Sequence, residues 1–162
     1  MPNMDFAWLD YVPETMQYIE NWLDEAAVRS TGLDDGFFSF YEYWANEDGF
    51  IVGTNYWCKV VSANGAPFAV IAFCLHEGKV IIQEMVICPE SRGKGMGTKL
   101  LKELLENEEI LGFSIQKSES VIFASNTASQ RAFEKAGFKC IRTDESGNAM
   151  HYAYESDYYG IQ

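Results

Sequence analysis

Apolar side chains recur at helical spacing in the first third of the chain. Residues 13–31 show this repeat, start at a proline that suits the first turn of a helix, and end at Gly32. Residues 36–49 form a second such stretch, which is dense in aromatic residues and flanked by glycines. We therefore expect two helices in this part of the chain.

Shorter and continuous apolar runs predict strands. One run, at residues 6–12, precedes the first helix, and three more follow the second helix. Asn64 and Gly65 separate the first two of these three, and this dipeptide is typical of a two-residue hairpin turn. The three runs cover residues 56–62, 67–75 and 80–88.

The second half of the chain alternates between the two patterns. The expected elements are a helix from the glycine segment to about residue 107, a strand at 120–125, a helix at 127–137, and a closing hairpin of 138–143 and 150–156. Antiparallel strands come first and a crossover of βαβ type lies in the middle. This order predicts a mixed α/β sandwich.

Length and composition favour a single domain over residues 1–162, since domains typically run to roughly 100 to 200 residues. The longest apolar runs fall short of the roughly 20 residues that a membrane span needs. The N-terminal segment has no basic stretch and no apolar run of signal-peptide type. We expect a cytoplasmic protein with no membrane partner.

The charge and the cysteines narrow the choice of partners. A net charge of −12 disfavours nucleic acids and anionic membranes and favours cationic partners. The four cysteines each lie in a strand-like run, without a CxxC pair or a histidine at metal-ligand spacing. Cys58, Cys74, Cys88 and Cys140 are therefore expected to be buried free thiols, and no metal is expected.

The stretch PESRGKGMGTKLL, residues 89–101, places three glycines at alternate positions ahead of an apolar helical run. No register gives the Walker A pattern, and the third glycine of a dinucleotide fingerprint would fall at Leu100. What remains is a turn and a helix whose first amides, from Gly93 to Thr98, are uncapped. Such an N-terminus attracts anions, and glycine at 95 and 97 would let a diphosphate lie against the backbone. The alternative is a turn that binds nothing.

Basic residues gather around the same segment of this acidic chain: Arg92, Lys94, Lys99 and Lys102. Arg92, Lys94 and Lys99 would add positive charge for a bound diphosphate.

Two motifs resemble those of the GNAT superfamily of acyl-CoA N-acyltransferases. VICPESRGKGMGTKLLKELL, residues 86–105, is similar to motif A, [QR]xxGx[GA], with Arg92, Gly95 and Gly97 in the fixed positions. ASNTASQRAFEKAGFKC, residues 124–140, is similar to motif B, in which an asparagine opens a helix that ends in YekxGF. The element order agrees with the family from end to end.

The resemblance implies an α/β (α+β) GNAT fold, with a central mixed, mostly antiparallel sheet of about seven strands and about four flanking helices. It also implies acetyl-CoA as co-substrate. Main-chain groups near the end of one strand would pair with the pantetheine arm, and the amides of the glycine segment would hold the pyrophosphate. The implied cofactor-binding residues are Met85, Val86, Ile87, Arg92, Gly93, Lys94, Gly95, Met96, Gly97, Thr98 and Asn126. Asn126 would contact the pantetheine or its carbonyl, and a simple helix cap is the alternative for this residue.

Members of the family transfer the acyl group by direct attack of an amine on the thioester. An alkylammonium of pKa ~10.4 must first lose a proton, which at pH 7 costs about 4.6 kcal/mol. Glu84 lies in an otherwise apolar run, where a carboxylate is costly unless it is solvated or paired. Many family members have a pocket-lining acid at this place, so Glu84 is expected to be the acceptor-binding anion and water-mediated general base. The alternative is a surface or structurally paired glutamate.

One position departs from the family pattern. Many members have a tyrosine as general acid where this chain has Phe133, and phenylalanine donates no proton. The thiolate, with a pKa near ~8.5, can leave unprotonated at modest cost. Alternatively, Tyr152, Tyr154 or His151 could donate the proton.

The acceptor is the least determined part of the prediction. Phe37, Phe40, Tyr41 and Trp44 share one helical face, which is either a core-facing stripe or a wall of the acceptor pocket beside carboxylates. A small cationic amine, such as a polyamine, an aminoglycoside or an amino-acid-like amine, fits the charge best. The alternatives are a protein N-terminus or lysine side chain as acceptor, and a non-catalytic acyl-CoA-binding or sensing domain, which Phe133 favours. A homodimer is possible.

Overall fold

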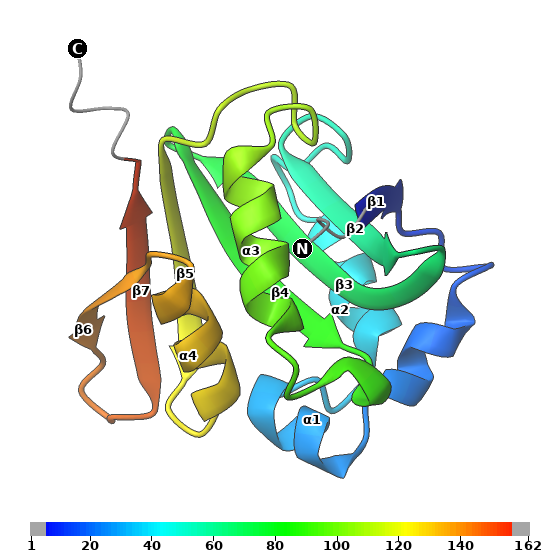
Figure 1. Cartoon of the computed structure of the whole chain (residues 1–162), viewed down its shortest axis with the longest axis horizontal. Coiled ribbons are helices and arrows are strands. Elements are labelled where there is room, and N and C mark those ends of the chain that lie inside the picture. Colours follow the sequence, from blue (N-terminus) through cyan, green and yellow to red (C-terminus); the bar gives the residue numbers. More distant parts are fainter. Residues whose placement is uncertain (1–5, 157–162) are drawn as a thin grey trace. The chain divides into compact units, whose positions relative to one another are not determined.

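The computed structural model describes residues 6–156, in which seven strands form one sheet of order β1-β2-β3-β4-β5-β7-β6 (Figure 1). The strands are Phe6–Asp10 (β1), Tyr56–Ala63 (β2), Ala66–His76 (β3), Lys79–Ile87 (β4), Lys117–Phe123 (β5), Lys139–Thr143 (β6) and Ala149–Glu155 (β7). The helices are Gln17–Trp22 (η1, 3₁₀), Glu25–Thr31 (α1), Phe37–Ala45 (α2), Pro89–Ser91 (η2, 3₁₀), Met96–Glu106 (α3) and Thr127–Lys135 (α4). β4 and β5 are parallel, whereas β1/β2, β2/β3, β5/β7 and β6/β7 are antiparallel. The predicted α/β (α+β) class with a mixed, mostly antiparallel sheet is confirmed.

The chain divides into two compact units. The first unit comprises Met1–Cys74 and Glu84–Arg92, and the second comprises Leu75–Gln83 and Gly93–Gln162. Strands β3 and β4 each contribute to both units. The single domain expected over residues 1–162 stays a prediction.

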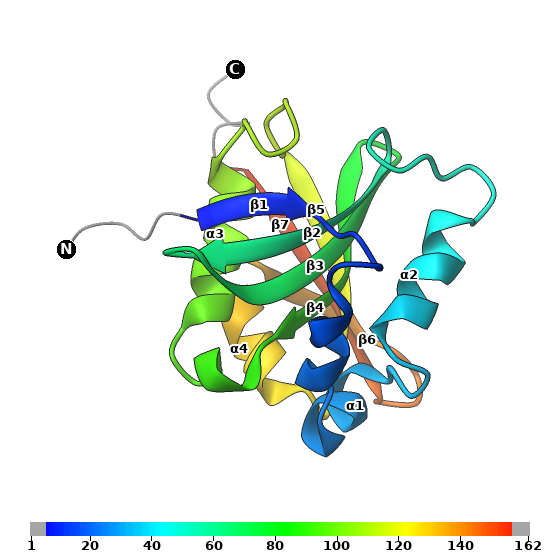
Figure 2. The ribbon, with the colours of Figure 1, turned by 90° about the vertical axis from the view of Figure 1, so that its right-hand side faces the viewer.

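The first unit is built on strands that are apolar on both faces. In β2 and β3 the residues Val60, Val61 and 69–73 are fully buried, which explains their continuous apolar sequence. The turn between these strands has φ of +54° at Asn64 and +84° at Gly65, as the dipeptide predicts. Within this unit, η1 and α2 lie next to each other (Figure 2).

The second unit buries the apolar side of two helices. In α3, Leu100, Leu101 and Leu104 are buried at helical spacing, and α3 packs beside α4 (Figure 1). β5 begins at Lys117, three residues earlier than expected. The added residues include the buried Ser118, whose hydroxyl donates to the carbonyl oxygen of Val80 at 2.7 Å.

The single helix expected over residues 13–31 is wrong. The segment forms η1 and α1 instead, and the chain is not helical at Asp24, where φ is −72° and ψ is 177°. Asp24 is the N-cap of α1, and its carboxylate accepts a hydrogen bond from the Ala27 N–H at 2.9 Å. An N-cap has an extended backbone, so the cap itself interrupts the helical pattern.

The cysteines follow the prediction at three of four positions. Cys58, Cys74 and Cys88 are buried and free, but Cys140 is exposed. The expectation is wrong for Cys140 because β6 lies at the edge of the sheet and all its residues are exposed. No helix within residues 6–156 is long and apolar enough to cross a membrane.

Candidate active site

The residues predicted to form the site are divided between the two units. Glu84, the backbone of 85–87 and Arg92 belong to the first unit, whereas the segment 93–98 and Asn126 belong to the second.

Glu84 lies in β4 with part of its surface exposed, and its carboxylate accepts a hydrogen bond from the Met85 N–H at 3.1 Å. Burial of the carboxylate raises its pKa from 4.5 to about 8, against the opposing effect of that hydrogen bond. About a tenth of such groups are ionised at pH 7. A carboxylate with a pKa near the working pH suits a general base.

The end of β4 is held in place on the first unit. Met85 and Val86 are buried, and the N–H of Cys88 donates to the carbonyl oxygen of Phe68 in β3 at 2.8 Å. The strand predicted to pair with pantetheine therefore ends at a buried segment that is hydrogen-bonded to β3.

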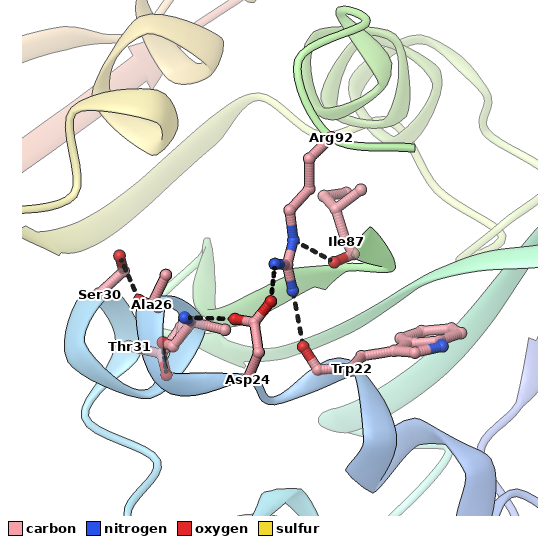
Figure 3. A network of polar contacts seen from close by, with 8 residues as sticks. Trp22, Asp24, Ala26, Ser30, Thr31, Ile87 and Arg92 are labelled. Carbon is pink, nitrogen blue, oxygen red and sulfur yellow. Dashed lines mark hydrogen bonds and ion pairs between the residues drawn. The ribbon is translucent and has the colours of Figure 1, made fainter. Parts of the chain in front are cut away.

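Arg92 follows η2, and its guanidinium group is bound by three acceptors of the same unit (Figure 3). Nε donates to the carbonyl oxygen of Ile87 at 3.0 Å. The terminal nitrogens donate to a carboxylate oxygen of Asp24 at 2.7 Å and to the carbonyl oxygen of Trp22 at 2.6 Å. This motif residue is thus bound to the end of β4 and to the junction of η1 and α1.

The glycine segment forms a left-handed turn into α3. Gly93 has φ of +75° and Gly95 has φ of +76°, a conformation that favours glycine. Turn geometry therefore explains both residues. Gly97 lies in the first turn of the helix, where glycine is less favourable than alanine by about 1 kcal/mol, and the turn geometry that explains Gly93 and Gly95 does not apply to it.

Gly95 is the N-cap of α3 and, because it has no side chain, makes no capping hydrogen bond of its own. The first bond of the helix runs from the Lys99 N–H to the Gly95 carbonyl at 3.2 Å. The amides of Met96, Gly97 and Thr98 precede that bond, so they are donors without an intrahelical partner. Lys94 and Lys99 are exposed.

Asn126 is the N-cap of α4, and its side-chain oxygen accepts a hydrogen bond from the Ser129 N–H at 3.1 Å. Asn126 therefore acts as a helix cap, which was the alternative role predicted for this residue from the sequence. Its contact with pantetheine stays a prediction.

Phe133 is a core residue of the second unit. Its side chain is buried, and its ring lies 4.9 Å from that of Phe138 and 6.5 Å from that of Tyr152. The Tyr152 hydroxyl donates to the Glu134 carboxylate at 2.8 Å, and burial together with Glu134 raises its pKa. Tyr152 is therefore a poor proton donor for a leaving thiolate. The ring of Tyr154 packs against Phe138.

The aromatic face predicted on α2 belongs to a larger cluster of the first unit. Phe37 is fully buried, whereas Phe40, Tyr41 and Trp44 keep part of their surface exposed. Three rings from outside the helix complete the cluster: Tyr11 lies 4.9 Å from Tyr41, Tyr56 lies 6.3 Å from Tyr41, and Phe50 lies 5.7 Å from Trp44. These rings lie outside the helix, and Tyr11 precedes it by 26 residues, so the pattern within α2 does not reveal them.

Carboxylates surround this aromatic cluster. Burial and the nearby Glu20 raise the pKa of Tyr11, and burial, Cys58, Asp10 and Glu14 raise that of Tyr41. Burial is the main cause of both shifts, and the carboxylates Glu20, Asp10 and Glu14 add to it because negative charge disfavours the phenolate. Rings beside carboxylates suit a cationic ligand.

Comparison with known proteins places the chain among acetyltransferases. A model of the acetyltransferase (GNAT) domain matches residues 40–140. The aminoglycoside acetyltransferase AAC(6')-Ib in complex with ribostamycin and coenzyme A has a similar structure, with a TM-score of 0.72 and 18% identity over 96% of both chains. No curated protein matches the chain.

Two further solved structures have the same fold. Spermidine N-acetyltransferase from Vibrio cholerae in complex with CoA and spermine gives a TM-score of 0.68 and 14% identity over 95% of this chain and 97% of that one. An uncharacterized protein from Bacillus halodurans gives 0.75 and 15% over 98% of this chain and 88% of that one.

Proposed function

The chain belongs to the GNAT family of acetyltransferases, and we propose that it transfers an acetyl group from acetyl-CoA to a small cationic amine. The family match confirms the resemblance carried by motifs A and B. In the proposed reaction the neutral amine nitrogen attacks the thioester carbonyl carbon. The C–N bond forms, the C–S bond breaks, the sulfur leaves as a thiolate, and the attacking nitrogen releases its remaining extra proton to solvent to give the neutral amide.

The observation that carries the proposal is the place of Glu84, a half-buried carboxylate in the mostly apolar strand β4, directly before the backbone of 85–87. The acceptor must lose a proton before or during the attack, and a carboxylate with a pKa of about 8 is a better proton acceptor than an ordinary one. Glu84, acting through a water molecule, takes the proton of the ammonium group and returns it to solvent.

Charge and aromatic surface support a cationic acceptor. The chain carries a net charge of −12, and the cluster around Tyr11 and Tyr41 combines rings with nearby Glu14 and Glu20. Structural neighbours were solved with ribostamycin and with spermine, both of which carry several amines. We infer that the acceptor is a polyamine, an aminoglycoside or an amino-acid-like amine.

The donor side rests on the start of α3 and the end of β4. The backbone of 85–87 would pair with pantetheine, and the amides of Met96, Gly97 and Thr98 would donate to the pyrophosphate. Lys94 and Lys99 would add charge. Asn126 would contact the pantetheine arm.

The leaving thiolate needs no acid in this proposal. Phe133 donates no proton, and the Tyr152 hydroxyl is engaged by Glu134. A thiol of pKa near ~8.5 leaves as the anion at a cost of about 2 kcal/mol at pH 7 relative to the protonated product.

The buried Phe133 also favours a second candidate, a domain that binds acyl-CoA without transfer. The two candidates differ in turnover. The test is release of free thiol from acetyl-CoA with a panel of polyamines, aminoglycosides, amino acids and peptide N-termini. Release with a cationic small amine supports the enzyme, release with peptides alone moves the acceptor to proteins, and binding of acetyl-CoA without any release supports the second candidate.

A further inference from the structure

Arg92 directs its charge toward the protein itself. One oxygen of the Asp24 carboxylate accepts from Arg92 at 2.7 Å, while the other oxygen caps α1 through the Ala27 N–H. The amide of Ala27 and the guanidinium group hold the pKa of Asp24 below its usual range, so the carboxylate stays ionised at neutral pH. A guanidinium group already paired with a carboxylate exerts a weaker field on a second anion.

The other two acceptors of Arg92 are the main-chain carbonyl oxygens of Trp22 and Ile87 (Figure 3). Trp22 ends η1, and its side chain is buried, which anchors this end of the helix. Ile87 ends β4. One side chain thereby joins the strand to segments that lie 68 and 70 residues away in sequence.

We propose that Arg92 is a positioning residue, which holds the end of β4 to the η1–α1 junction, instead of a ligand of the CoA pyrophosphate. The inference rests on the proposed function, because the positioned strand is the one expected to pair with pantetheine. Nε fixes the carbonyl of Ile87, and hence the orientation of the last peptide group of that strand. Asp24 keeps the guanidinium group in place.

This assignment leaves the exposed Lys94 and Lys99 as the cations for the pyrophosphate. It also means that Asp24, although negatively charged, promotes binding of the negatively charged acetyl-CoA. Asp24 acts by holding Arg92 and not through its own charge.

Two conservative variants separate positioning from charge. Arg92→Lys keeps the positive charge but loses the planar fork that binds three acceptors. Asp24→Asn keeps an oxygen for the N-cap of α1, since asparagine caps as well as aspartate, but loses the charge that holds Arg92. The measurement is the Kd of acetyl-CoA by calorimetry for both variants, for the double variant, and for the wild-type protein.

If Arg92 is a positioning residue, each single variant should weaken acetyl-CoA binding about tenfold. The double variant should bind acetyl-CoA as well as either single variant, because each substitution already removes the contact between Asp24 and Arg92. If Arg92 instead binds the pyrophosphate by charge, Arg92→Lys retains the wild-type Kd and Asp24→Asn binds more tightly, since an anion is lost. That result overturns the proposal, as does a lower unfolding midpoint with an unchanged Kd.

A matched control and a second readout complete the test. Arg29→Gln breaks the exposed Glu25–Arg29 ion pair of the same helix, and its Kd should equal that of the wild type. Failure of the wild-type protein to bind acetyl-CoA contradicts the proposed function. Amide hydrogen exchange of residues 87–92 without ligand then decides on positioning alone: faster exchange in Asp24→Asn supports it, and unchanged exchange overturns it.

Discussion

Helices α3 and α4 begin in the same unit but satisfy their first amides in different ways. Asn126 caps α4 with its side-chain oxygen, whereas Gly95 opens α3 and has no side chain to offer. In the first unit, Asp24 caps α1, and the Glu20 carboxylate accepts from the Phe37 and Phe38 amides of α2 at 2.9 Å each. The difference is consistent with our proposal that the N-terminal donors of α3 bind the pyrophosphate of acetyl-CoA.

The uncapped N-terminus of α3 lowers the stability of the helix, and burial of its apolar residues offsets this loss. A glycine inside a helix is unfavourable by about 1 kcal/mol relative to alanine, and α3 carries Gly97 in its first turn, directly after the N-cap Gly95 and Met96. Four buried leucines, Leu100, Leu101, Leu104 and Leu105, stabilise it instead, each by about 1.5–3 kcal/mol. The helix thus forms without the cap that α4 uses.

The largest expected effect comes from closing the open start. Gly97→Asp adds a carboxylate where the pyrophosphate is proposed to bind, and should weaken acetyl-CoA binding at least about a hundredfold through repulsion and loss of space. The helix itself should be as stable or more stable, because glycine is removed and an acid suits the first turn. Calorimetry and thermal unfolding measure the two effects.

Ala128→Asp is the matched control, since Ala128 is the second residue of the capped helix α4 and is exposed. It should leave the Kd unchanged. Wild-type affinity in Gly97→Asp would show that the uncapped helix start is not the cofactor site.

The next effect, on stability and not on binding, is expected when the cap of α2 is displaced. At Gly36 a Cβ would lie 2.6 Å from a Glu20 carboxylate oxygen, and φ is +91°. Gly36→Ala should therefore lower the free energy of unfolding by about 2–4 kcal/mol, from backbone strain and loss of the cap. Urea unfolding measures it.

Gly49→Ala is the control for strain alone, because Gly49 has φ of +89° and its Cβ would meet nothing within 4 Å. Gly36→Ala should be the more destabilising of the two. Equal losses would mean that Glu20 moves aside freely and contributes little as a cap.

The smallest effect is expected at Asn126. Asn126→Ala removes the cap of α4 and should cost about 1 kcal/mol, whereas Asn126→Asp keeps a capping oxygen and the stability. If Asn126 also donates to the pantetheine arm, Asn126→Asp loses a fewfold of acetyl-CoA affinity, about 1 kcal/mol. Unchanged affinity in Asn126→Asp would argue against the contact with pantetheine.

Most helices, strands and turns could be predicted from patterns of neighbouring residues in the sequence. Most features that the sequence did not predict depend on contacts between residues far apart in the chain. The hairpin turn at Asn64–Gly65 depends on its own two residues, so the sequence is sufficient to place it. The interruption at Asp24 has a local signal, an acidic residue ahead of a helix-favouring stretch, but the apolar repeat on both sides conceals it. Its ion pair with Arg92 spans 68 residues, which no periodicity reports.

The same division holds for the candidate site. The glycine segment is readable because its turn and helix start follow from adjacent residues. The Glu20 cap of α2 and the rings of Tyr11 and Tyr56 come from distant segments that only the fold brings together. The raised pKa of Glu84 likewise depends on burial, which an apolar run suggests but does not quantify.

The most direct test of the account is the pH dependence of kcat/KM for acetyl transfer, measured with acceptor amines of different pKa. Because the deprotonated carboxylate is the base, activity should rise with pH through an apparent pKa near 8 that is the same for all acceptors. Glu84→Gln should still bind acetyl-CoA, but its kcat should be roughly a hundredfold lower. Its kcat/KM should no longer rise with pH through a pKa near 8. If Glu84→Gln keeps the wild-type rate and pH profile, Glu84 is not the base and the central claim is wrong.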